Sequence, residues 1–467
     1  MRRPTPWITS STRQPRDWPM TRKTAAFITL GCKINQYETE AIREEVLGLG
    51  YEEVPPEKPA DVYVVNTCAV TATAGVKSRK AMLRAARTNP ETRIIVVGCS
   101  TAAEKETFAR IPQVVFLAGN EEKAQVASFL EGSWKPGEPF PDRDRDILSL
   151  RISRYRDRTR ATIKVQDGCN NFCSFCIIPH LRGISRSRHP DAVVEEVRRL
   201  ADAGYLEVVI SGIHLQDYGL DLEPRTTLVE LLGRIGEVDG LERIRLSSLG
   251  PRAFRPELID VLDSPRFCRH WHIPIQSGSD PVLAVMRRGY TLEEYRQAVA
   301  RLRERFRDPA ITTDVIVGHP GETRERFEES VEVYRELEFP KIHVFPFSAR
   351  EGTLATKILD ERVEPPEIRR RAAVLGELEK KMGLEFRRRS VGDVLEVLVE
   401  GEARGDPSSL EGLTGRYQRV RFPAPSSFSR QRFPGTLQQV RALEVTADGL
   451  AGEWAERPVE GPEEATA

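Results

Sequence analysis

Short apolar runs alternate with amphipathic segments through residues 24–135. Four of these runs have the length and residue types of buried strands: 25–30, 61–66, 93–98 and 114–119. The segments 40–50 and 76–87, which lie between strands, carry the apolar periodicity of helices. This alternation is typical of an α/β fold with a parallel sheet, so we expect such a domain over 24–135. Proline and charged residues dominate after it, and we expect a linker over 136–157.

The same alternation returns over residues 158–387. Six strand candidates follow one another at 161–166, 207–211, 243–248, 271–276, 312–317 and 342–347. Amphipathic segments such as 191–204 and 291–306 separate them. Six such units predict an α/β domain that is either a partial (β/α)6 barrel or a doubly wound sheet. In both folds the chemistry takes place at the carboxyl ends of the strands.

A third pattern follows a charged helical segment at 363–389. Short strand candidates separated by Gly and Pro occupy 394–401, 415–422, 435–445 and 450–454. They predict a small antiparallel β-barrel over 388–455. The ends of the chain differ in charge: residues 1–23 hold six Arg and Lys against one Asp, whereas residues 456–467 are acidic. We expect both tails to be disordered, and Met20 is a second candidate start because ordered patterning begins just after it.

Composition narrows the class of protein. A length of 467 residues suggests roughly three domains. Hydrophobic residues make up 39% and charged residues 30%, with 70 basic and 70 acidic residues, which excludes a disordered chain, a collagen and a coiled coil. No apolar run reaches the roughly 18 residues of a membrane helix, and the N-terminus lacks the apolar segment of a secretory signal. We therefore expect a cytoplasmic protein. Its seven cysteines are too sparse for a disulfide scaffold, so we expect free thiols, metal ligands or catalytic thiols.

Three cysteines form a C-x3-C-x2-C motif directly after the first strand of the second domain. Cys169, Cys173 and Cys176 share one loop, and thiolates this close can converge on one iron–sulfur cluster. Three ligands for a four-iron cluster leave one iron open to a substrate or cosubstrate. The alternatives are a zinc loop, for which His180 is the nearest fourth ligand, or three packed thiols.

Three further cysteines are spread along the first domain. Cys32, Cys68 and Cys99 each follow the end of a predicted parallel strand by one or two residues. Because parallel strands end at the same edge of a sheet, these cysteines are expected to meet in one crevice. A second three-cysteine site is the favoured interpretation, and three unrelated buried thiols are the alternative.

The second domain resembles the radical S-adenosylmethionine (SAM) superfamily. The resemblance implies that Cys169, Cys173 and Cys176 hold a 4Fe-4S cluster whose open iron binds SAM, which is then cleaved to a 5′-deoxyadenosyl radical. The superfamily has a Gly-rich segment after its second strand that meets the SAM amino group. Ser211 and Gly212 stand at that place here, although a simple turn explains them equally well.

The motifs in combination look like those of the methylthiotransferases, over roughly residues 24–455. They are LGCKINQYETE, VNTCAVT, VVGC, GCNNFCSFCIIPHLRGISRSR, IPIQSGSD, TTDVIVGHPGE and FPFSAREGT. The resemblance implies a second 4Fe-4S cluster on Cys32, Cys68 and Cys99, and a C-terminal TRAM domain. Lys33, the run Gln36-Tyr37-Glu38 and Thr71 look like the branch that modifies N6-threonylcarbamoyladenosine. His319 stands where the family usually has Phe.

Basic and aromatic residues alternate near the C-terminus. The stretch 416–441 has no acidic residue, and its aromatic residues are interleaved with Arg416, Arg419, Arg421, Arg430, Arg432 and Arg441. Arginines engage phosphates and aromatic rings stack on unpaired bases, so this stretch is a candidate RNA-binding segment. A solvated face over core aromatics is the alternative. Cys268 is interpreted as a packed thiol. His214 and His272 lie close to the expected catalytic edge and are interpreted as packing residues, with a role in substrate binding as the alternative.

The family resemblance implies methylthiolation of C2 of N6-threonylcarbamoyladenosine at position 37 of tRNA. The expected cofactors are two 4Fe-4S clusters and SAM, and the expected partners are the tRNA anticodon loop, a reducing electron donor and a sulfur source. The alternatives are a methylthiotransferase for isopentenyl-adenosine tRNA or a ribosomal-protein aspartate, and, from another class, a non-catalytic iron–sulfur RNA-binding or sensor protein.

Overall fold

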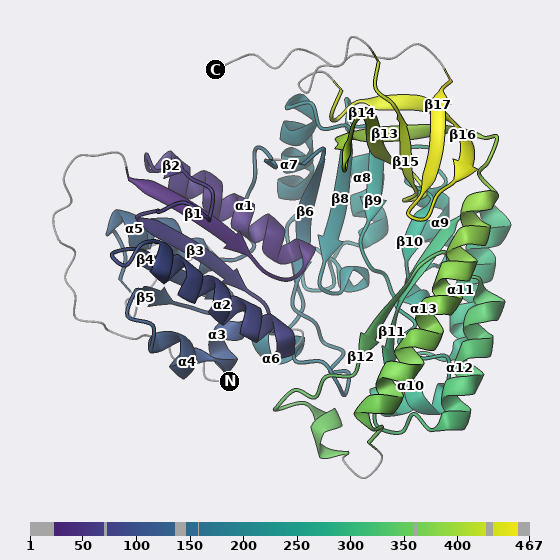
Figure 1. Ribbon diagram of the computed structural model, residues 1–467, viewed down its shortest axis with the longest axis horizontal. Helices are drawn as coiled ribbons and strands as arrows, with labels where there is room; N and C mark the ends of the chain where they lie inside the picture. The colour runs from purple at the N-terminus through teal and green to yellow at the C-terminus, as the bar shows by residue number, and fades with distance from the viewer. Residues whose placement is uncertain are drawn as a thin grey trace. The chain divides into compact units, whose positions relative to one another are not determined.

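The structure is a computed structural model that describes residues 23–69, 72–135, 146–156, 158–358, 362–425 and 433–455 (Figure 1). Its chain forms two compact units. Unit 1 contains residues 1–153, 164–172 and 176–188, and unit 2 contains the intervening segments 154–163 and 173–175 together with 189–467. The predicted tails and Thr71 lie outside the described residues.

A five-stranded parallel sheet forms the centre of unit 1. Its strands lie in the order β2-β1-β3-β4-β5, with bounds β1 Thr24–Thr29, β2 Glu52–Glu53, β3 Val62–Thr67, β4 Arg93–Gly98 and β5 Val114–Leu117. The four strands predicted from the apolar runs are therefore confirmed. Only the two-residue edge strand β2 was not predicted, because two glutamates carry no apolar signal.

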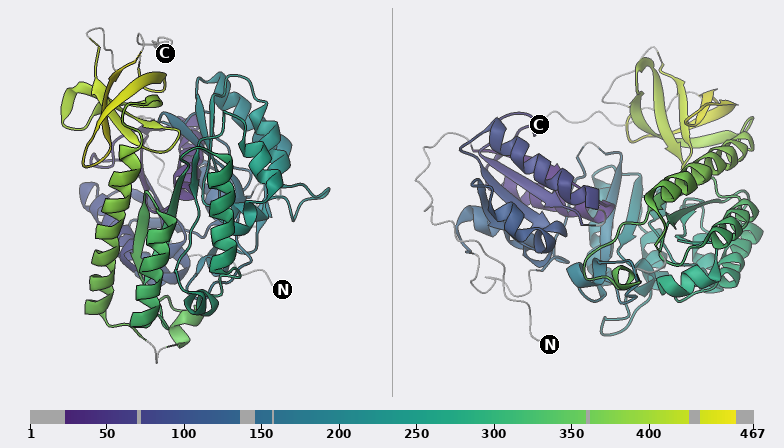
Figure 2. Two further views of the ribbon diagram at one scale, coloured as in Figure 1. Left: turned by 90° about the vertical axis from the view of Figure 1, so that its right-hand side faces the viewer. Right: turned by 60° about the horizontal axis from the view of Figure 1, so that its bottom comes forward.

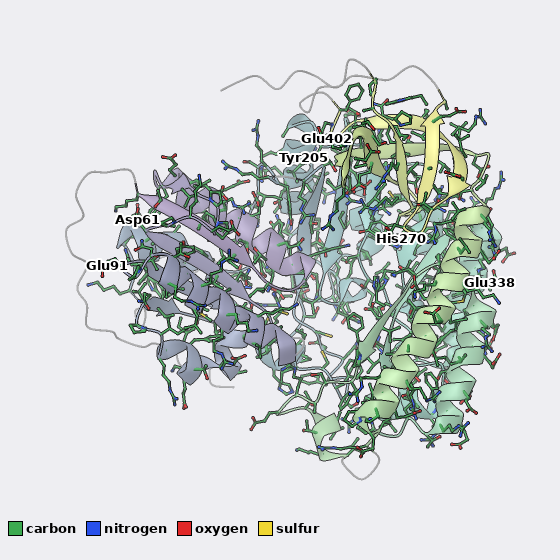
Figure 3. All side chains as sticks on the ribbon, viewed as in Figure 1. Asp61, Glu91, Tyr205, His270, Glu338 and Glu402 are labelled. Atoms are coloured by element: carbon green, nitrogen blue, oxygen red, sulfur yellow. The ribbon has the colours of Figure 1, made fainter. Side chains whose placement is uncertain are left out.

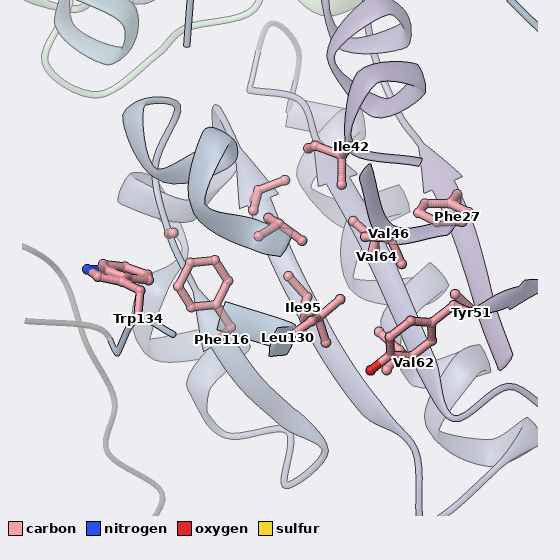
Figure 4. Close-up of a cluster of buried hydrophobic side chains, with 14 residues drawn as sticks. Phe27, Ile42, Val46, Tyr51, Val62, Val64, Ile95, Phe116, Leu130 and Trp134 are labelled. Carbon is pink, nitrogen blue, oxygen red and sulfur yellow. The ribbon is translucent and has the colours of Figure 1, made fainter. Parts of the chain in front are cut away.

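Helices cover both faces of this sheet (Figure 2). They are α1 Lys33–Gly48, α2 Ala72–Thr88, α3 Ser100–Ala103, α4 Lys105–Ala109, the 3-10 turn η1 Glu121–Gln125 and α5 Val126–Glu131. Ile42 and Val46 of α1 pack with Leu130 of α5 on one face, in the cluster drawn in Figure 4. Met82 of α2 and Phe108 of α4 pack on the other face. The two faces together form the core of an α/β layer.

Helix α1 begins seven residues earlier than the apolar period predicts. Its N-cap is Cys32 in an extended conformation, and the helix starts at Lys33 rather than at residue 40. The early turns of α1 are polar in sequence, yet Asn35 and Glu38 are buried there. Polar side chains buried in a helix need partners, and these partners come from elsewhere in unit 1.

Six strands of the predicted second α/β domain follow one another in space in their sequence order. They are β6 Arg160–Asp167, β8 Glu207–Gly212, β9 Arg243–Leu246, β10 His270–His272, β11 Ala310–Val317 and β12 Ile342–Pro346. The sheet β7-β6-β8-β9 adds the short antiparallel strand β7 (Arg186–Ser187), and the sheet β10-β11-β12 adjoins β9 through a bridge between Ile244 and Phe267. A doubly wound sheet would reverse its strand order, so the partial barrel is confirmed.

Helices follow the barrel strands. Their bounds are α6 Ile178–Arg182, α7 Pro190–Asp202, α8 Leu228–Gly236, α9 Pro256–Leu262, α10 Asp280–Met286, α11 Leu292–Arg305 and α12 Arg324–Leu337, with 3-10 turns η2 Leu215–Asp217, η3 Pro251–Ala253 and η4 Leu354–Lys357. Thr227 and Thr291 close capping boxes at the starts of α8 and α11. The short helices α6, α9 and α10 were not predicted, because each is too brief to show a period.

A closed five-stranded barrel follows the long helix α13 (Pro365–Arg388). Its strands are β13 Val394–Ala403, β14 Asp406–Thr414, β15 Arg419–Pro423, β16 Leu437–Val445 and β17 Leu450–Trp454, in the order β13-β14-β15-β17-β16. Its pairs are antiparallel except β15 with β17, which is parallel and differs from the all-antiparallel expectation. Among the described residues, no helix is long and apolar enough to cross a membrane.

Candidate functional site

Two of the first-domain cysteines meet at the carboxyl edge of the parallel sheet. Thr67 of β3 and Gly98 of β4 are paired in register, so Cys68 and Cys99 follow at neighbouring positions. The backbone N–H of Cys99 donates to the carbonyl of Thr67 across 3.1 Å, which holds the two chain segments together. Both cysteines are buried. Strand register therefore brings together two residues that lie 31 positions apart in sequence.

Cys32 reaches the same edge through a glycine. Gly31 has a φ of +107°, and a Cβ atom built there would lie 2.7 Å from Cβ and 2.9 Å from Sγ of Cys68. The loop before Cys32 thus packs directly on Cys68. Asn35, on the first turn of α1, donates to the carbonyls of Leu30 and Thr67 at 2.8 and 2.9 Å and so fastens this loop to β3.

The three-cysteine edge fits an iron–sulfur cluster in its chemistry. Cys32 is exposed, and no disulfide joins it or its neighbours among the cysteines that the structure describes. The amide nitrogen of Asn120 lies 3.6 Å from Sγ of Cys99, so a polar donor faces this sulfur. Soft sulfur ligands with hydrogen-bond donors around them are the typical setting of such clusters.

The C-x3-C-x2-C loop begins at a glycine that admits no side chain. Gly168 has a φ of +74°, and a Cβ atom there would lie 1.9 Å from the carbonyl oxygen of Ile184. The backbone N–H of Cys169 donates to Gly183 across 3.1 Å. Cys169, Cys173 and Cys176 are all partly exposed and form no disulfide in the described structure, so this thiol set also fits a cluster. The ring of His180, the alternative zinc ligand, packs edge-on against Phe172.

Within unit 2 an arginine holds the middle cysteine of this loop. Nη1 of Arg288 donates to Sγ of Cys173 across 3.2 Å, and Nε donates to the hydroxyl of Tyr290. Burial works against the charge of Arg288, but Tyr290 and Cys173 outweigh it and keep the pKa of Arg288 above its ordinary value. This guanidinium is a fixed positive charge beside a candidate cluster ligand, and sequence reasoning missed it.

His319, which replaces the usual Phe of the family, contacts the same loop. Its Nε2 lies 3.1 Å from the hydroxyl of Ser174, and its Nδ1 lies 2.8 Å from the carbonyl of Pro320. The carbonyl can only accept, so Nδ1 carries the proton and Nε2 accepts from Ser174. Burial lowers the pKa of His319 to about 4. His319 therefore stays neutral and anchors the loop between Cys173 and Cys176.

The structure also gives the positions of the other residues that the sequence analysis singled out. Ser211 and Gly212 end β8, and Ser211 is buried. His214 pairs with Asp217 at 2.9 Å. Cys268 is buried, and burial raises the pKa of its thiol, as befits a packed residue.

Three polar side chains lie together on β10, β11 and β12, and of these the sequence pointed only to His272. Nε2 of His272 is 3.2 Å from Asp314, and Asp314 is paired in register with His343. The ligand-type atoms of these three side chains lie within 4.8 Å of one another. Burial lowers the pKa of His343, and His272 acts in the same direction. The group can hydrogen-bond a polar molecule at this face of the sheet.

Some of the C-terminal arginines that were predicted to bind RNA are paired within the protein. Arg416 lies 3.2 Å from Ser390 and 3.7 Å from Asp393, whereas Arg419 pairs with Glu411. Arg421 is exposed on β15, and Arg430 and Arg432 lie outside the described residues. The stretch lacks acidic residues in sequence, but acidic residues of neighbouring strands face it.

The described aromatic residues of the same stretch make contacts within the protein. Phe422 and Phe433 are buried in the barrel core and are not available to stack on bases. Tyr417 stacks on His270, which is labelled in Figure 3, with ring centroids 4.7 Å apart. The guanidinium of Arg245 lies 4.9 Å from the ring of Tyr417. Tyr417 nevertheless remains 42% exposed, and Phe428 lies outside the described residues. Among the described residues of this stretch, Tyr417 and the exposed arginines are therefore the side chains that an RNA could meet.

Two segments of the chain match models of known protein families. Residues 163–333 match the model of the radical SAM superfamily, and residues 24–119 match the uncharacterized protein family UPF0004. The chain is 39% identical to the threonylcarbamoyladenosine tRNA methylthiotransferase of Bacillus subtilis, covering 85% of this chain and 90% of that protein. It is 34% identical to the tRNA-2-methylthio-N(6)-dimethylallyladenosine synthase of Carboxydothermus hydrogenoformans, covering 86% and 94%.

A solved structure shares the fold. The radical SAM methyltransferase TsrM of Kitasatospora setae, solved with cobalamin and a [4Fe-4S] cluster, superposes with a TM-score of 0.53 at 16% identity. The match covers 80% of this chain and 79% of that one. At this identity the likeness concerns the fold alone.

Proposed function

The chain belongs to the methylthiotransferase family of radical-SAM enzymes, and we propose that it transfers a methylthio group to C2 of N6-threonylcarbamoyladenosine at position 37 of tRNA. Its cofactors are two 4Fe-4S clusters and SAM. The observation that supports the proposal is the presence of two separate three-cysteine sets, one at a sheet edge and one in the loop after β6. A single-cluster radical enzyme would need only the second set.

Cys169, Cys173 and Cys176 are the proposed ligands of the SAM-binding cluster. When bound, the cluster and SAM supply the one-electron chemistry that an unactivated aromatic C–H bond requires. The protein's part is positional: Gly168 bends the chain into the loop, and His319 holds Ser174 between two of the cysteines. Arg288 provides a positive charge and a hydrogen bond at Cys173.

Cys32, Cys68 and Cys99 are the proposed ligands of the second cluster, which supports sulfur delivery. Strand register fixes Cys68 beside Cys99, and the close contact of Gly31 with Cys68 brings the Cys32 loop to the same edge. Asn35 keeps that loop in place through the carbonyl of Thr67. Backbone register and the close approach of Gly31 thus support the proposal that the three cysteines share one site.

The remaining residues orient the substrates. Ser211 and Gly212, at the carboxyl end of β8, are the proposed contacts of SAM. The base must leave its stack to reach both sites, which favours an anticodon-loop nucleotide that is already unpaired. The five-stranded barrel, proposed to be a TRAM domain, places Arg419 and Arg421 on one short strand, where they can meet tRNA phosphates. A reducing electron donor and a sulfur source complete the reaction, which we place in the cytoplasm with its tRNA substrate.

One experiment separates this function from its nearest alternative. Relatives at 34% identity are named for dimethylallyladenosine, so the nature of the N6 substituent is the open choice within the family. Mass spectrometry of tRNA nucleosides from cells with and without the gene should show loss of 2-methylthio-N6-threonylcarbamoyladenosine alone. Loss of the isopentenyl nucleoside instead would contradict the proposed substrate.

A sensor role would give a different result in vitro. A non-catalytic iron–sulfur protein should release no 5′-deoxyadenosine when it is reduced in the presence of SAM. The proposed enzyme should release it and should modify tRNA only when both cysteine sets are intact.

A further inference from the structure

Five charged side chains lie together in the interior of unit 1, and none is more than 1% exposed. They are Glu38 of α1, Lys123, Lys164 and Asp167 of β6, and Arg182 of α6. We refer to them as the buried ion cluster. It joins two chain segments that are more than a hundred residues apart in sequence, because Glu38 lies in the first-domain helix and Lys164 in the first barrel strand.

Each acidic group in the buried ion cluster has several cationic partners. Glu38 pairs with Lys123, accepts from Lys164 at 3.1 Å and accepts from Arg182 at 2.9 Å. Asp167 accepts from Arg182 at 3.0 Å on each carboxylate oxygen and lies 3.3 Å from Lys164. Arg182 is thus clamped between two carboxylates, one from each segment.

The buried ion cluster is connected to both cysteine sets. On one side, Oδ1 of Asp167 accepts from the backbone N–H of Gly168 at 2.8 Å, directly before Cys169. On the other side, Nη2 of Arg182 donates to Oδ1 of Asn35 at 2.8 Å. Asn35 in turn bonds the carbonyl of Thr67, directly before Cys68.

A second path runs beside the first. The side-chain amide of Asn120 donates to the carbonyl of Leu181 at 2.9 Å and lies 3.6 Å from Sγ of Cys99. Leu181 is the neighbour of Arg182 in α6. The short helix α6 is therefore bonded to Asn35 and Asn120. Asn35 in turn contacts Thr67, the residue before Cys68, and Asn120 contacts Cys99.

A buried ion network is a poor way to gain stability alone. Taking charges out of water is costly, and apolar residues of equal volume often stabilise a fold as well or better. What paired charges and directional hydrogen bonds do provide is a defined geometry, since each carboxylate and guanidinium must keep its partners. The buried ion cluster is built for position rather than for packing.

We propose that the buried ion cluster is a positioning device that fixes the Cys169 loop relative to Cys32, Cys68 and Cys99, and so holds the two cluster sites of the proposed enzyme at one separation. The inference rests on the proposed function for the presence of two clusters. Its own content is that Glu38, Asp167 and Arg182 act through the cysteine loops and contact neither substrate.

The test is the distribution of distances between the two reduced clusters, measured by pulsed dipolar EPR on the reconstituted full-length protein. Wild-type protein should give a narrow distribution. Glu38→Gln keeps the size of the side chain but removes the charge that Lys123, Lys164 and Arg182 share, and should broaden the distribution. In the same variant 5′-deoxyadenosine should still form, whereas methylthio product should be lost.

A matched control exists in unit 2. Glu207 of β8 is also fully buried and pairs with two arginines, at 2.9 Å with Arg243 and 2.8 Å with Arg245. Glu207→Gln therefore makes the same chemical change to a buried carboxylate that has no contact with a cysteine loop. Its distance distribution should remain narrow.

The outcomes are separable. If wild-type protein shows no dipolar interaction between two clusters, the proposed function itself fails. A narrow distribution in Glu38→Gln, or equal broadening in Glu207→Gln, overturns the positioning role. If Glu38→Gln does not fold, Arg182→Lys replaces it, because lysine keeps the charge but cannot span Asp167, Glu38 and Asn35 together; a narrow distribution there is equally decisive against the proposal.

Discussion

The guanidinium of Arg288 donates a hydrogen bond to the sulfur of Cys173 across 3.2 Å. Hydrogen bonds and positive charge at a ligand sulfur favour the more reduced, more negative form of a cluster. The contact also joins a residue that follows α10 to the middle of the C-x3-C-x2-C loop. If Cys173 is a cluster ligand as proposed, this contact gives the fold a direct influence on the electron affinity of that cluster.

Replacing this arginine should lower that electron affinity. In a chain that lacks Cys32, Cys68 and Cys99, Arg288→Met is expected to shift the reduction potential of the remaining cluster to more negative values and to slow SAM cleavage. Redox titration followed by EPR measures the shift. Arg252→Met, which removes an exposed arginine paired with Glu294, serves as the control. Equal potentials in both variants would contradict the role of Arg288.

Removing the thiols of the C-x3-C-x2-C loop should remove one cluster. The reconstituted protein is expected to hold about eight irons, and the triple Ala variant of Cys169, Cys173 and Cys176 about four. It should release no 5′-deoxyadenosine. Cys268→Ala removes a buried thiol that is not a proposed ligand and should keep the full iron content. Cleavage of SAM by the triple variant would refute the ligand assignment.

Removing the other three thiols should separate the two half-reactions. With Cys32, Cys68 and Cys99 replaced by Ala, 5′-deoxyadenosine should still appear because the C-x3-C-x2-C loop, the proposed site of SAM cleavage, is intact. Methylthiolated tRNA should be absent, as judged by nucleoside mass spectrometry. Undiminished product in this variant would mean that the three thiols are only packed.

Acid should weaken the buried ion cluster. Burial raises the pKa of Glu38, but Arg182, Lys123 and Lys164 outweigh burial and hold that pKa well below its usual value. The carboxylate therefore contributes stability above its unfolded-state pKa of about 4.3, and this contribution is lost as the pH falls below that value toward the folded-state pKa. Asp167, the other acid of the cluster, faces two of these cations, Arg182 and Lys164, which likewise hold its pKa below the ordinary value.

The corresponding measurement is urea unfolding of the full chain at several pH values. At pH 7 Glu38→Gln should cost roughly 3–5 kcal/mol, the range for breaking a buried ion pair. The difference from wild type should shrink as the pH falls below about 4.3, because the unfolded-state carboxylate then binds a proton while the folded-state carboxylate binds one only at lower pH. Glu304→Gln, on an exposed helix position, should show neither effect. If the loss of stability in Glu38→Gln does not depend on pH, the stabilising role of the Glu38 charge is contradicted.

Salt dependence of tRNA binding should distinguish two arginines of the C-terminal barrel. Arg421 is exposed, so Arg421→Gln is expected to flatten the slope of log affinity against log salt by about 0.7 to 0.9, the value of one phosphate contact. Arg416 is held by Ser390 and Asp393, so Arg416→Gln should change the slope little. If both variants flatten the salt slope equally, the slope reports the net charge of the barrel, and the proposed phosphate contact of Arg421 is contradicted.

The positions of the cysteines followed from sequence because the backbone alone determines them. Parallel strands that end in register must bring Cys68 beside Cys99, and apolar runs mark those ends clearly. Strand β14 was missed for the opposite reason. Its sequence, DPSSLEGLT, has little strand character, and pairing with β13 on one side and β15 on the other makes it a strand.

The electrostatic parts of the site were not accessible from sequence. Glu38 reads as an ordinary charged residue of a helix, and only the tertiary fold buries it against Lys164 and Arg182. Asp314 and His343 share one face only because β11 and β12 pair in a particular register. For the stretch 416–441 the sequence overestimated the number of available arginines, because Glu411 and Asp393 pair with Arg419 and Arg416 from neighbouring segments.

The close contacts of Gly31 and Gly168 leave these two positions with little tolerance for amino-acid substitution. Every missense change of a glycine codon adds a side chain, and here a Cβ atom would meet Cys68 at 2.7 Å or the Ile184 carbonyl at 1.9 Å. Random mutagenesis should therefore yield inactive alleles at codons 31 and 168 whose six proposed ligand cysteines are all intact. Such alleles would resemble loss of a cluster while carrying every sulfur needed to bind it.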